Sequence, residues 1–193
     1  LEMDIITRCY SDLLTSDPIP PTTRLPFSKE EIKKVWEHQK EPWVDTVLIL
    51  LYSGWRISEL LNLKPEDINL QAGTMKGGTK TKAGKDRVVP IHSKIRALVE
   101  ARLAEGGPRL ISYNGRACSQ TQYRVFWADI MKALEMNHTP HECRHTFETQ
   151  LDSAGANRKC IDLLMGHVSK DTGNRVYNHK TLDELKATVE LIQ

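Results

Sequence analysis

The chain has 193 residues, of which 39% are hydrophobic, and a formal net charge of +2, which suits one domain with a sizeable core. No apolar run approaches the roughly 18 residues that a membrane span needs, and no charged, apolar leader opens the chain, so we expect no membrane partner and no signal peptide. The four cysteines form no C-x-x-C pair, which indicates free thiols in a reducing cytoplasm.

Residues 1–27 are predicted to form an arm or interdomain linker. The run from Asp17 to Arg24 contains three prolines, which remove backbone donors and fix φ, so it cannot sustain a helix. An arm that opens a compact domain indicates that something precedes it in the full protein.

Helices are predicted directly after the arm. The capping box Ser28-Lys-Glu-Glu31 starts one that runs to about Gln39. Pro42 opens a second helix, whose apolar residues 44–51 leave little polar face, so we expect it at the centre of the core, ending at Gly54. A short helix over 57–63 follows and ends before a proline.

The only β-like region comes next. Residues 67–70, 74–78 and 87–91 are predicted as short strands, with Ala83-Gly84 in a turn. Amphipathic helices are predicted over 93–103, 119–134, 141–153, 158–165 and 182–192. The expected fold class is mainly α with a small three-stranded antiparallel sheet (α+β), organised as a linker (1–27), a main domain (28–180) and a C-terminal helix (181–193).

Positive charge gathers in the strand region. Between residues 76 and 96 seven cations face Asp86 alone, a local charge of +6 that leaves −4 on the rest of the chain. Such a patch suits a polyanion such as DNA, whereas the plain alternative is a solvated hairpin. The cations are Lys76, Lys80, Lys82, Lys85, Arg87, Lys94 and Arg96.

Three other clusters could carry chemistry. Arg56 and Glu59, in Ser53-Gly-Trp-Arg-Ile-Ser-Glu-Leu60, share a helix face and could simply form a structural ion pair. The second cluster, Pro140-His-Glu-Cys-Arg-His-Thr-Phe147, puts His141, Arg144 and His145 within one helical turn. The third is Leu164-Met-Gly-His167, with Tyr177 ten residues further on.

The middle cluster also matches a zinc-protease signature. His141-Glu142-Cys-Arg-His145 has the pattern H-E-x-x-H, in which two histidines ligate zinc and the glutamate is a general base. Arg144 between the two histidines disfavours a cation there. A zinc hydrolase is therefore a remote alternative, and we expect no metal and no cofactor.

Taken in order, these clusters resemble the boxes of the tyrosine recombinases, also called phage integrases, over residues 28–180. The resemblance implies the catalytic-domain fold of that family and is most similar to integrases of phages and conjugative transposons. The family's usual N-terminal core-binding domain is absent from these residues. The matching residues are Arg56, the hairpin lysine Lys80 (with Lys82 as the alternative), His141, Arg144, His167 and Tyr177.

The resemblance implies a mechanism. Tyr177 attacks a phosphodiester and forms a 3′-phosphotyrosine, while Arg56 and Arg144 hold the non-bridging oxygens with permanently charged forks. His167 donates a further hydrogen bond, and His141 positions the tyrosine or accepts its proton. The hairpin lysine protonates the leaving 5′-oxygen, and neither ATP nor a metal is required.

Further roles follow from the same resemblance. Glu59 is expected to orient Arg56 or a histidine, and His145 to pack or hold its helix. The expected DNA-binding residues are Lys76, Lys82, Lys85 and Arg87. The expected partners are double-stranded DNA at attachment sites, further copies of the chain in a DNA-bound dimer or tetramer, and an accessory DNA-bending factor, all in the bacterial cytoplasm at the nucleoid.

Two questions stay open at this stage. The apolar stripe Leu182, Leu185 and Val189 fits a helix that packs on its own domain and equally one that docks on a neighbouring protomer. A type IB topoisomerase would use the same chemistry for nicking and closing, and a non-catalytic DNA-binding protein could keep the fold. We expect recombination, for the integration and excision of a mobile element.

Overall fold

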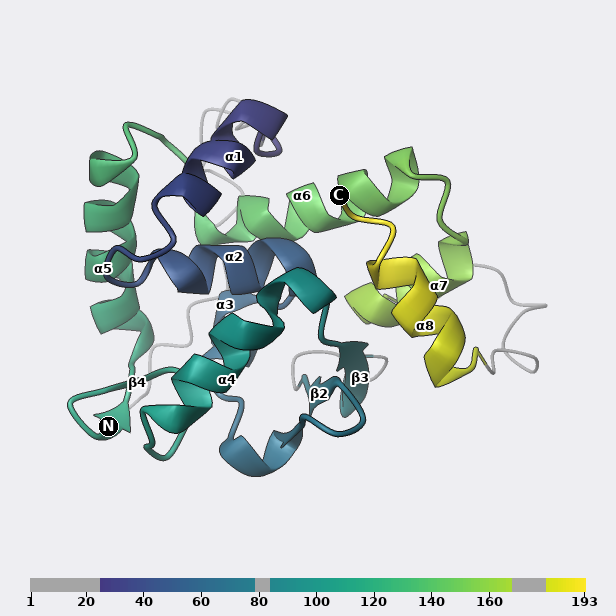
Figure 1. Ribbon diagram of the computed structural model, residues 1–193, viewed down its shortest axis with the longest axis horizontal. Coiled ribbons are helices and arrows are strands. Elements are labelled where there is room, and N and C mark those ends of the chain that lie inside the picture. Colours follow the sequence, from purple (N-terminus) through teal and green to yellow (C-terminus); the bar gives the residue numbers. More distant parts are fainter. Residues whose placement is uncertain (1–24, 79–83, 168–179) are drawn as a thin grey trace, which may run out of the picture.

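The computed structural model describes residues 25–78, 84–167 and 180–193, which are mainly helical (Figure 1). Strands β1 (Ile68–Asn69), β2 (Thr74–Gly77) and β3 (Arg87–Pro90) form the predicted antiparallel sheet in the order β1-β2-β3. Within the described ranges, no helix has the length and apolar character that crossing a bilayer requires. The helices are α1 (Lys29–Glu37), α2 (Val44–Ser53), α3 (Ile57–Leu60), α4 (Arg96–Ala104), α5 (Gln120–Ala133), α6 (Pro140–Ser153), α7 (Arg158–Met165) and α8 (Leu182–Val189), with 3-10 turns η2 (Pro65–Asp67) and η3 (Ser93–Ile95).

A second, two-stranded sheet corrects the prediction that residues 67–91 hold the only β structure. Strands β4 (Ser112–Tyr113) and β5 (Arg116–Ala117) pair antiparallel. Between them Asn114 and Gly115 have φ values of 51° and 72°. Asn-Gly is the pair that best tolerates two positive φ angles in a tight hairpin, so the signal for this turn was present in the sequence.

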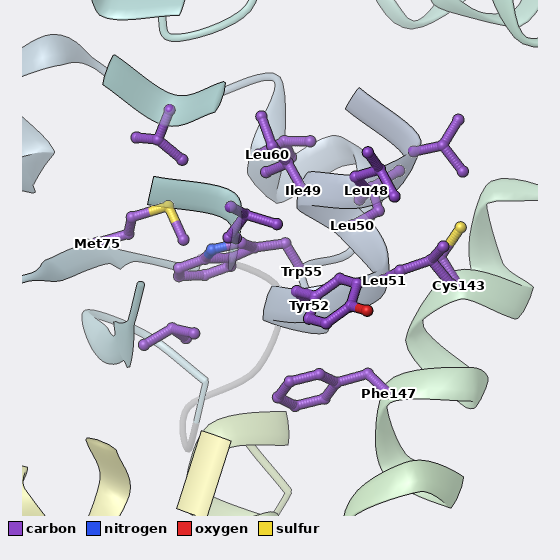
Figure 2. Packing of buried hydrophobic residues seen from close by; sticks show 14 of the residues in the cluster. Leu48, Ile49, Leu50, Leu51, Tyr52, Trp55, Leu60, Met75, Cys143 and Phe147 are labelled. Atoms are coloured by element: carbon purple, nitrogen blue, oxygen red, sulfur yellow. The ribbon is translucent and has the colours of Figure 1, made fainter. Parts of the chain in front are cut away.

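Helix α2 lies at the centre of the core, as its composition predicts. All of its residues except Asp45 are buried, and it packs along α6 (Figure 1). Figure 2 shows its residues between Trp55 on one side and Cys143 and Phe147 of α6 on the other. The helix ends at Gly54, which has a φ of +63°, so the chain turns sharply immediately before Arg56.

The residue directly before the predicted boundary is buried against the domain. Phe27, which the sequence assigns to the arm, is 4% exposed. Its backbone N–H donates to Thr146 Oγ1 of α6 at 2.8 Å, and its ring stacks on His138 with the centroids 3.8 Å apart. Helix α1 then starts with the predicted capping box between Ser28 and Glu31.

Helix α8 packs on its own domain, next to α7 and β3 (Figure 1). Leu185 and Val189 of the predicted stripe are buried, and Ile192 after the helix is 3% exposed. The chain end is held by Tyr52 Oη, which donates to the carbonyl of Gln193 at 3.3 Å. Of the two positions left open by the sequence, this structure therefore contains the intramolecular one.

A buried histidine at the same place should make the stability of the fold sensitive to acid. His92 Nδ1 accepts from the N–H of Lys94 at 3.0 Å, and its Nε2 donates to the carbonyl of Ile192, also at 3.0 Å. This arrangement requires a neutral ring. Burial lowers the pKa of His92, despite the opposing effects of the Ile192 carbonyl and of Glu190.

The free energy of unfolding should therefore fall as the pH drops below about 6.5, because the unfolded chain then binds a proton that folded His92 does not. Above that pH the contribution of His92 is constant. Urea denaturation at a series of pH values measures the effect, and His92→Gln should flatten it. Burial and then Arg144 also lower the pKa of His167. His167→Gln therefore measures how much of the pH dependence comes from His167 and not from His92. Equal pH dependence in wild type and His92→Gln would contradict this assignment.

Candidate active site

One face of α6 forms the floor of a pocket of about 300 Å³. Pro140 occupies the first turn of α6, and Thr139 forms a capping box with Glu142, so the helix starts at the first residue of the predicted cluster. Successive turns then bring four side chains to one face. The pocket is lined by Arg56, His141, Arg144, His145, Glu148, Met165 and His167, so three of the predicted clusters meet there.

Arg144 joins these clusters directly. Its Nη1 donates to the carbonyl of Gly54 at 2.6 Å, and its Nη2 donates to the carbonyl of Met165. The same Nη2 lies 3.3 Å from Nε2 of His167. Because a guanidinium carries five N–H donors, the group keeps donors for a ligand in the pocket that it lines.

Charge and burial set the protonation of this pair. Burial, followed by the nearby Arg56 and Arg87, lowers the pKa of Arg144 to about 9, so the group stays cationic at neutral pH. His167 has a lowered pKa and is neutral there. Arginine can only donate, so Nε2 of His167 is an acceptor and the ring proton is on Nδ1. Any hydrogen bond that His167 donates to a substrate must come from Nδ1.

Arg56 is held by a buried carboxylate. Glu59 accepts from the backbone N–H of Arg56 at 3.1 Å and, through Oε1, from Nη1 at 3.0 Å. Its Oε2 also accepts from Arg87 Nη2 at 2.8 Å. Burial by itself would raise the pKa of Glu59, but the hydrogen bonds and charges of Arg87 and Arg56 outweigh it and lower the pKa. Glu59 is thus an ionised bridge between two guanidinium groups.

The pocket wall carries excess positive charge. Arg56 and Arg87 both act electrostatically on Arg144, and two carboxylates oppose these charges. Glu59 is buried between Arg56 and Arg87, whereas Glu148 lines the pocket and also pairs with Arg158. Uncompensated buried charge is costly, and an anion in the pocket would offset that cost. The arrangement therefore favours a ligand with negatively charged oxygens, for which arginine forks are suited.

The other predicted residues divide into three groups. His141 and His145 are both exposed and line the pocket. Lys76 and Lys85 are exposed on the β2–β3 side of the domain. Three predicted residues lie outside the described residues: Lys80, Lys82 and Tyr177.

Arg87, which was predicted to contact DNA, is buried in this structure. Its side chain is only 3% exposed and is bonded to Glu59. The alternation of the strand decides this outcome, because Val88, the next residue, is exposed instead. A basic run on a hairpin does not reveal which of its cations faces inward.

Glu148 is a pocket residue that the motifs did not indicate. It lies one helical turn after Arg144 and accepts from Arg158 Nη2 at 2.9 Å. Arg158 also bonds Asp162 at 3.1 Å. The charge of Glu148 opposes the lowering of the pKa of both Arg144 and His167. The i+4 spacing from Arg144 was the signal that could have identified it.

The geometry does not fit the zinc alternative. Glu142, the general base in that interpretation, is 8% exposed. Its Oε2 accepts from the N–H of Thr139 at 2.7 Å and lies 3.0 Å from Nδ1 of His138, so it serves as a helix cap. In the part of the chain that the structure describes, no group of three or more His, Cys, Asp or Glu side chains could hold a metal ion.

The mainly helical fold and the arginine–histidine pocket of this chain are those of a tyrosine recombinase catalytic domain. The chain belongs to the phage integrase family, whose model matches residues 27–184. It is 33% identical over 193 residues to the tyrosine recombinase XerA of Pyrococcus furiosus, an alignment that covers 93% of this chain and 66% of the relative. The chain thus spans just under two thirds of that relative's length.

Solved structures agree on the fold. The Tn1549 transposon integrase in complex with transposon right end DNA matches with a TM-score of 0.67 at 24% identity, covering 95% of this chain and 70% of the integrase. The crystal structure of the XerA recombinase matches with a TM-score of 0.66 at 26% identity, covering 87% of this chain and 65% of the other.

Proposed function

We propose that this chain is the catalytic part of a site-specific DNA recombinase that cleaves and rejoins strands through a 3′-phosphotyrosyl intermediate. One observation carries the proposal: Arg144 is anchored between the carbonyls of Gly54 and Met165, in a pocket that also presents Arg56 and His167. These are the residues that the family's chemistry requires, gathered from three separate segments.

The pocket charge suits the transition state of phosphodiester cleavage. Attack by the Tyr177 oxygen forms the new O–P bond and breaks the bond to the 5′-oxygen. The pentavalent phosphorus between these states carries extra negative charge, which Arg56 and Arg144 stabilise through their forks. Because the guanidinium groups supply this charge, the reaction needs no metal, and the phosphotyrosine conserves the bond energy, so it needs no ATP.

The proton transfers are assigned to the remaining predicted residues. His141, exposed on the pocket, positions Tyr177 or accepts its proton. Lys80, with Lys82 as the alternative, protonates the leaving 5′-oxygen. His167 donates to a non-bridging oxygen through Nδ1, since its Nε2 faces Arg144.

We infer duplex DNA attachment sites as the substrate, bound by a dimer or tetramer that acts in the cytoplasm at the nucleoid. The Tn1549 integrase, which shares this fold, was solved in complex with transposon right end DNA, and this supports integration and excision of a mobile element. Lys76 and Lys85 are exposed and available for phosphate contacts. In such an assembly α8 could exchange its intramolecular position for one on a neighbour, and an accessory factor could bend the DNA.

A suicide substrate tests the proposal. We incubate the full-length protein that contains this chain, called the full-length parent below, with nicked DNA that bears its attachment site. The reaction contains EDTA, and the products are resolved on a denaturing gel. We expect a covalent protein–DNA band that Tyr177→Phe abolishes, because the phenyl ring has no nucleophilic oxygen.

Absence of the band with the parent on a verified site would refute the strand-transfer proposal and favour a DNA-binding role alone. Relaxation of plasmid supercoils without any paired site would indicate topoisomerase activity instead. A band that persists in Tyr177→Phe would assign the nucleophile to another residue.

A further inference from the structure

Arg87 is a buried cation whose place in the reaction is not explained by DNA binding. Its Nη2 donates to Glu59 Oε2 at 2.8 Å, and its Nε donates to the carbonyl of Leu164 at 3.0 Å. The guanidinium lies over the ring of Trp55, 4.0 Å from the centroid. One planar group thus contacts Glu59 of α3, the core residue Trp55 and the end of α7.

Two glycines leave room for the Arg87 side chain and for the backbone of Gly84, which precedes β3. A Cβ on Gly166 would lie 2.7 Å from the Cα of Gly84 and 3.3 Å from Arg87 Cδ. A Cβ on Gly78 would lie 2.8 Å from Arg87 Nη1. The glycine of Leu164-Met-Gly-His167 therefore allows the turn before β3 to approach the end of α7 closely enough for Arg87 to reach it.

The end of α7 holds two guanidinium groups with adjacent carbonyls. Leu164 accepts from Arg87, and Met165 accepts from Arg144. A helix C-terminus carries partial negative charge on its free carbonyls, which favours cations there. On the opposite side Glu59 holds Arg87 and Arg56 together. Arg87 therefore contacts both the carboxylate that holds Arg56 and the helix end that holds Arg144.

Stability alone does not account for this arrangement. Arg87 Nη1 is buried and has no hydrogen-bond partner among the described residues, and an unsatisfied buried donor costs free energy. Replacing a buried ion pair by apolar groups is often neutral or stabilising. A buried arginine that is incompletely satisfied is better explained by what it positions.

We propose that Arg87 is a positioning residue for strand cleavage: it fixes the Glu59 carboxylate that holds Arg56 and ties β3 to the α7 end that holds Arg144. This inference rests on the proposed function. A lysine at this position would bring one ammonium in place of a planar fork, so it could not serve Glu59 and Leu164 at once and could not stack on Trp55.

The first test separates positioning from simple stabilisation by its pH profile. Without Arg87, Glu59 loses its principal charge partner, so burial should raise its pKa and the carboxylate should protonate at a higher pH. In the full-length parent we expect Arg87→Met to cleave the nicked substrate about 10- to 100-fold more slowly, with unchanged DNA affinity. We also expect the fall in cleavage rate on the acid side of the pH profile to move to higher pH. The double variant Glu59→Gln/Arg87→Met should lack that displacement.

Matched variants control for folding and charge. Arg109 also donates to a backbone carbonyl, that of Asn62 at 3.1 Å, but it lies outside the basic run of residues 76–96 and outside the pocket. Arg109→Met should leave both the rate and the pH profile as in wild type. Arg87→Lys keeps the positive charge, so if Arg87→Met fails to fold, the lysine variant should still show slow cleavage.

The second test does not depend on cleavage. In the 193-residue chain, the ¹⁵N NMR signal of Arg56 Nε–Hε, assigned by its loss in Arg56→Lys, should shift in Arg87→Lys and stay in place in Arg109→Met. An unmoved Arg56 signal would overturn the inference, as would wild-type cleavage with an unchanged pH profile in Arg87→Met. If the parent forms no covalent complex, the proposed function fails, and the Arg56 signal alone decides whether Arg87 positions it.

Discussion

Replacing Arg144 with lysine should slow formation of the covalent protein–DNA complex by about 10²- to 10³-fold, the usual effect of losing one preorganised donor to a developing oxyanion. The guanidinium donates to the Gly54 and Met165 carbonyls and still lines the pocket. A lysine ammonium cannot span both carbonyls and also form a bidentate fork on a phosphate. Single-turnover cleavage of the nicked substrate at saturating protein measures this effect.

Arg102→Lys is the matched control for losing a buried guanidinium. Arg102 is also buried and forms two hydrogen bonds of 2.6 Å to Asp45, between α2 and α4. It lies outside the pocket, so the variant should lose stability but cleave at the wild-type rate below its unfolding temperature. Similar cleavage defects in Arg102→Lys and Arg144→Lys would mean that the loss reflects folding, and the role assigned to Arg144 would be wrong.

Gly54→Ala should destabilise the domain strongly. A side chain at its φ of +63° costs about 1–2 kcal/mol. The added Cβ would also lie 2.4 Å from Cδ1 of Phe147, whose ring is fully buried between α2 and α6 (Figure 2), and such overpacking typically costs about 1–3 kcal/mol more. Equilibrium urea denaturation should therefore show a loss of about 2–5 kcal/mol, the sum of these two effects.

Two comparisons separate the causes of that loss. Gly155 has a similar φ of +72° with nothing within 4 Å of an added Cβ, so Gly155→Ala should show the conformational cost alone. Adding Phe147→Leu to Gly54→Ala should recover part of the overpacking cost, because the smaller side chain can move away. Equal losses in the two glycine variants would show that contact with Phe147 contributes nothing.

Local signals in the chain suffice to predict most of the elements and the polar residues at the pocket. The box Ser28-Lys-Glu-Glu31 predicts the start of α1 because a cap satisfies donors within one turn. Gly54 predicts the end of α2 because only glycine adopts a positive φ without cost. The i, i+3 and i+4 spacing of His141, Arg144 and His145 places them on one face of α6 for the same local reason.

Tertiary packing decided which cations face inward and what they hold. A run of lysines and arginines has the same composition whether a side chain meets solvent or a carboxylate 28 residues away in the chain, as Arg87 meets Glu59. The position of α8 was equally undecided, because Leu185 and Val189 would pack on any complementary apolar face. Local periodicity describes one element at a time, whereas burial and charge pairing depend on which elements become neighbours, and that is determined only when the whole domain packs.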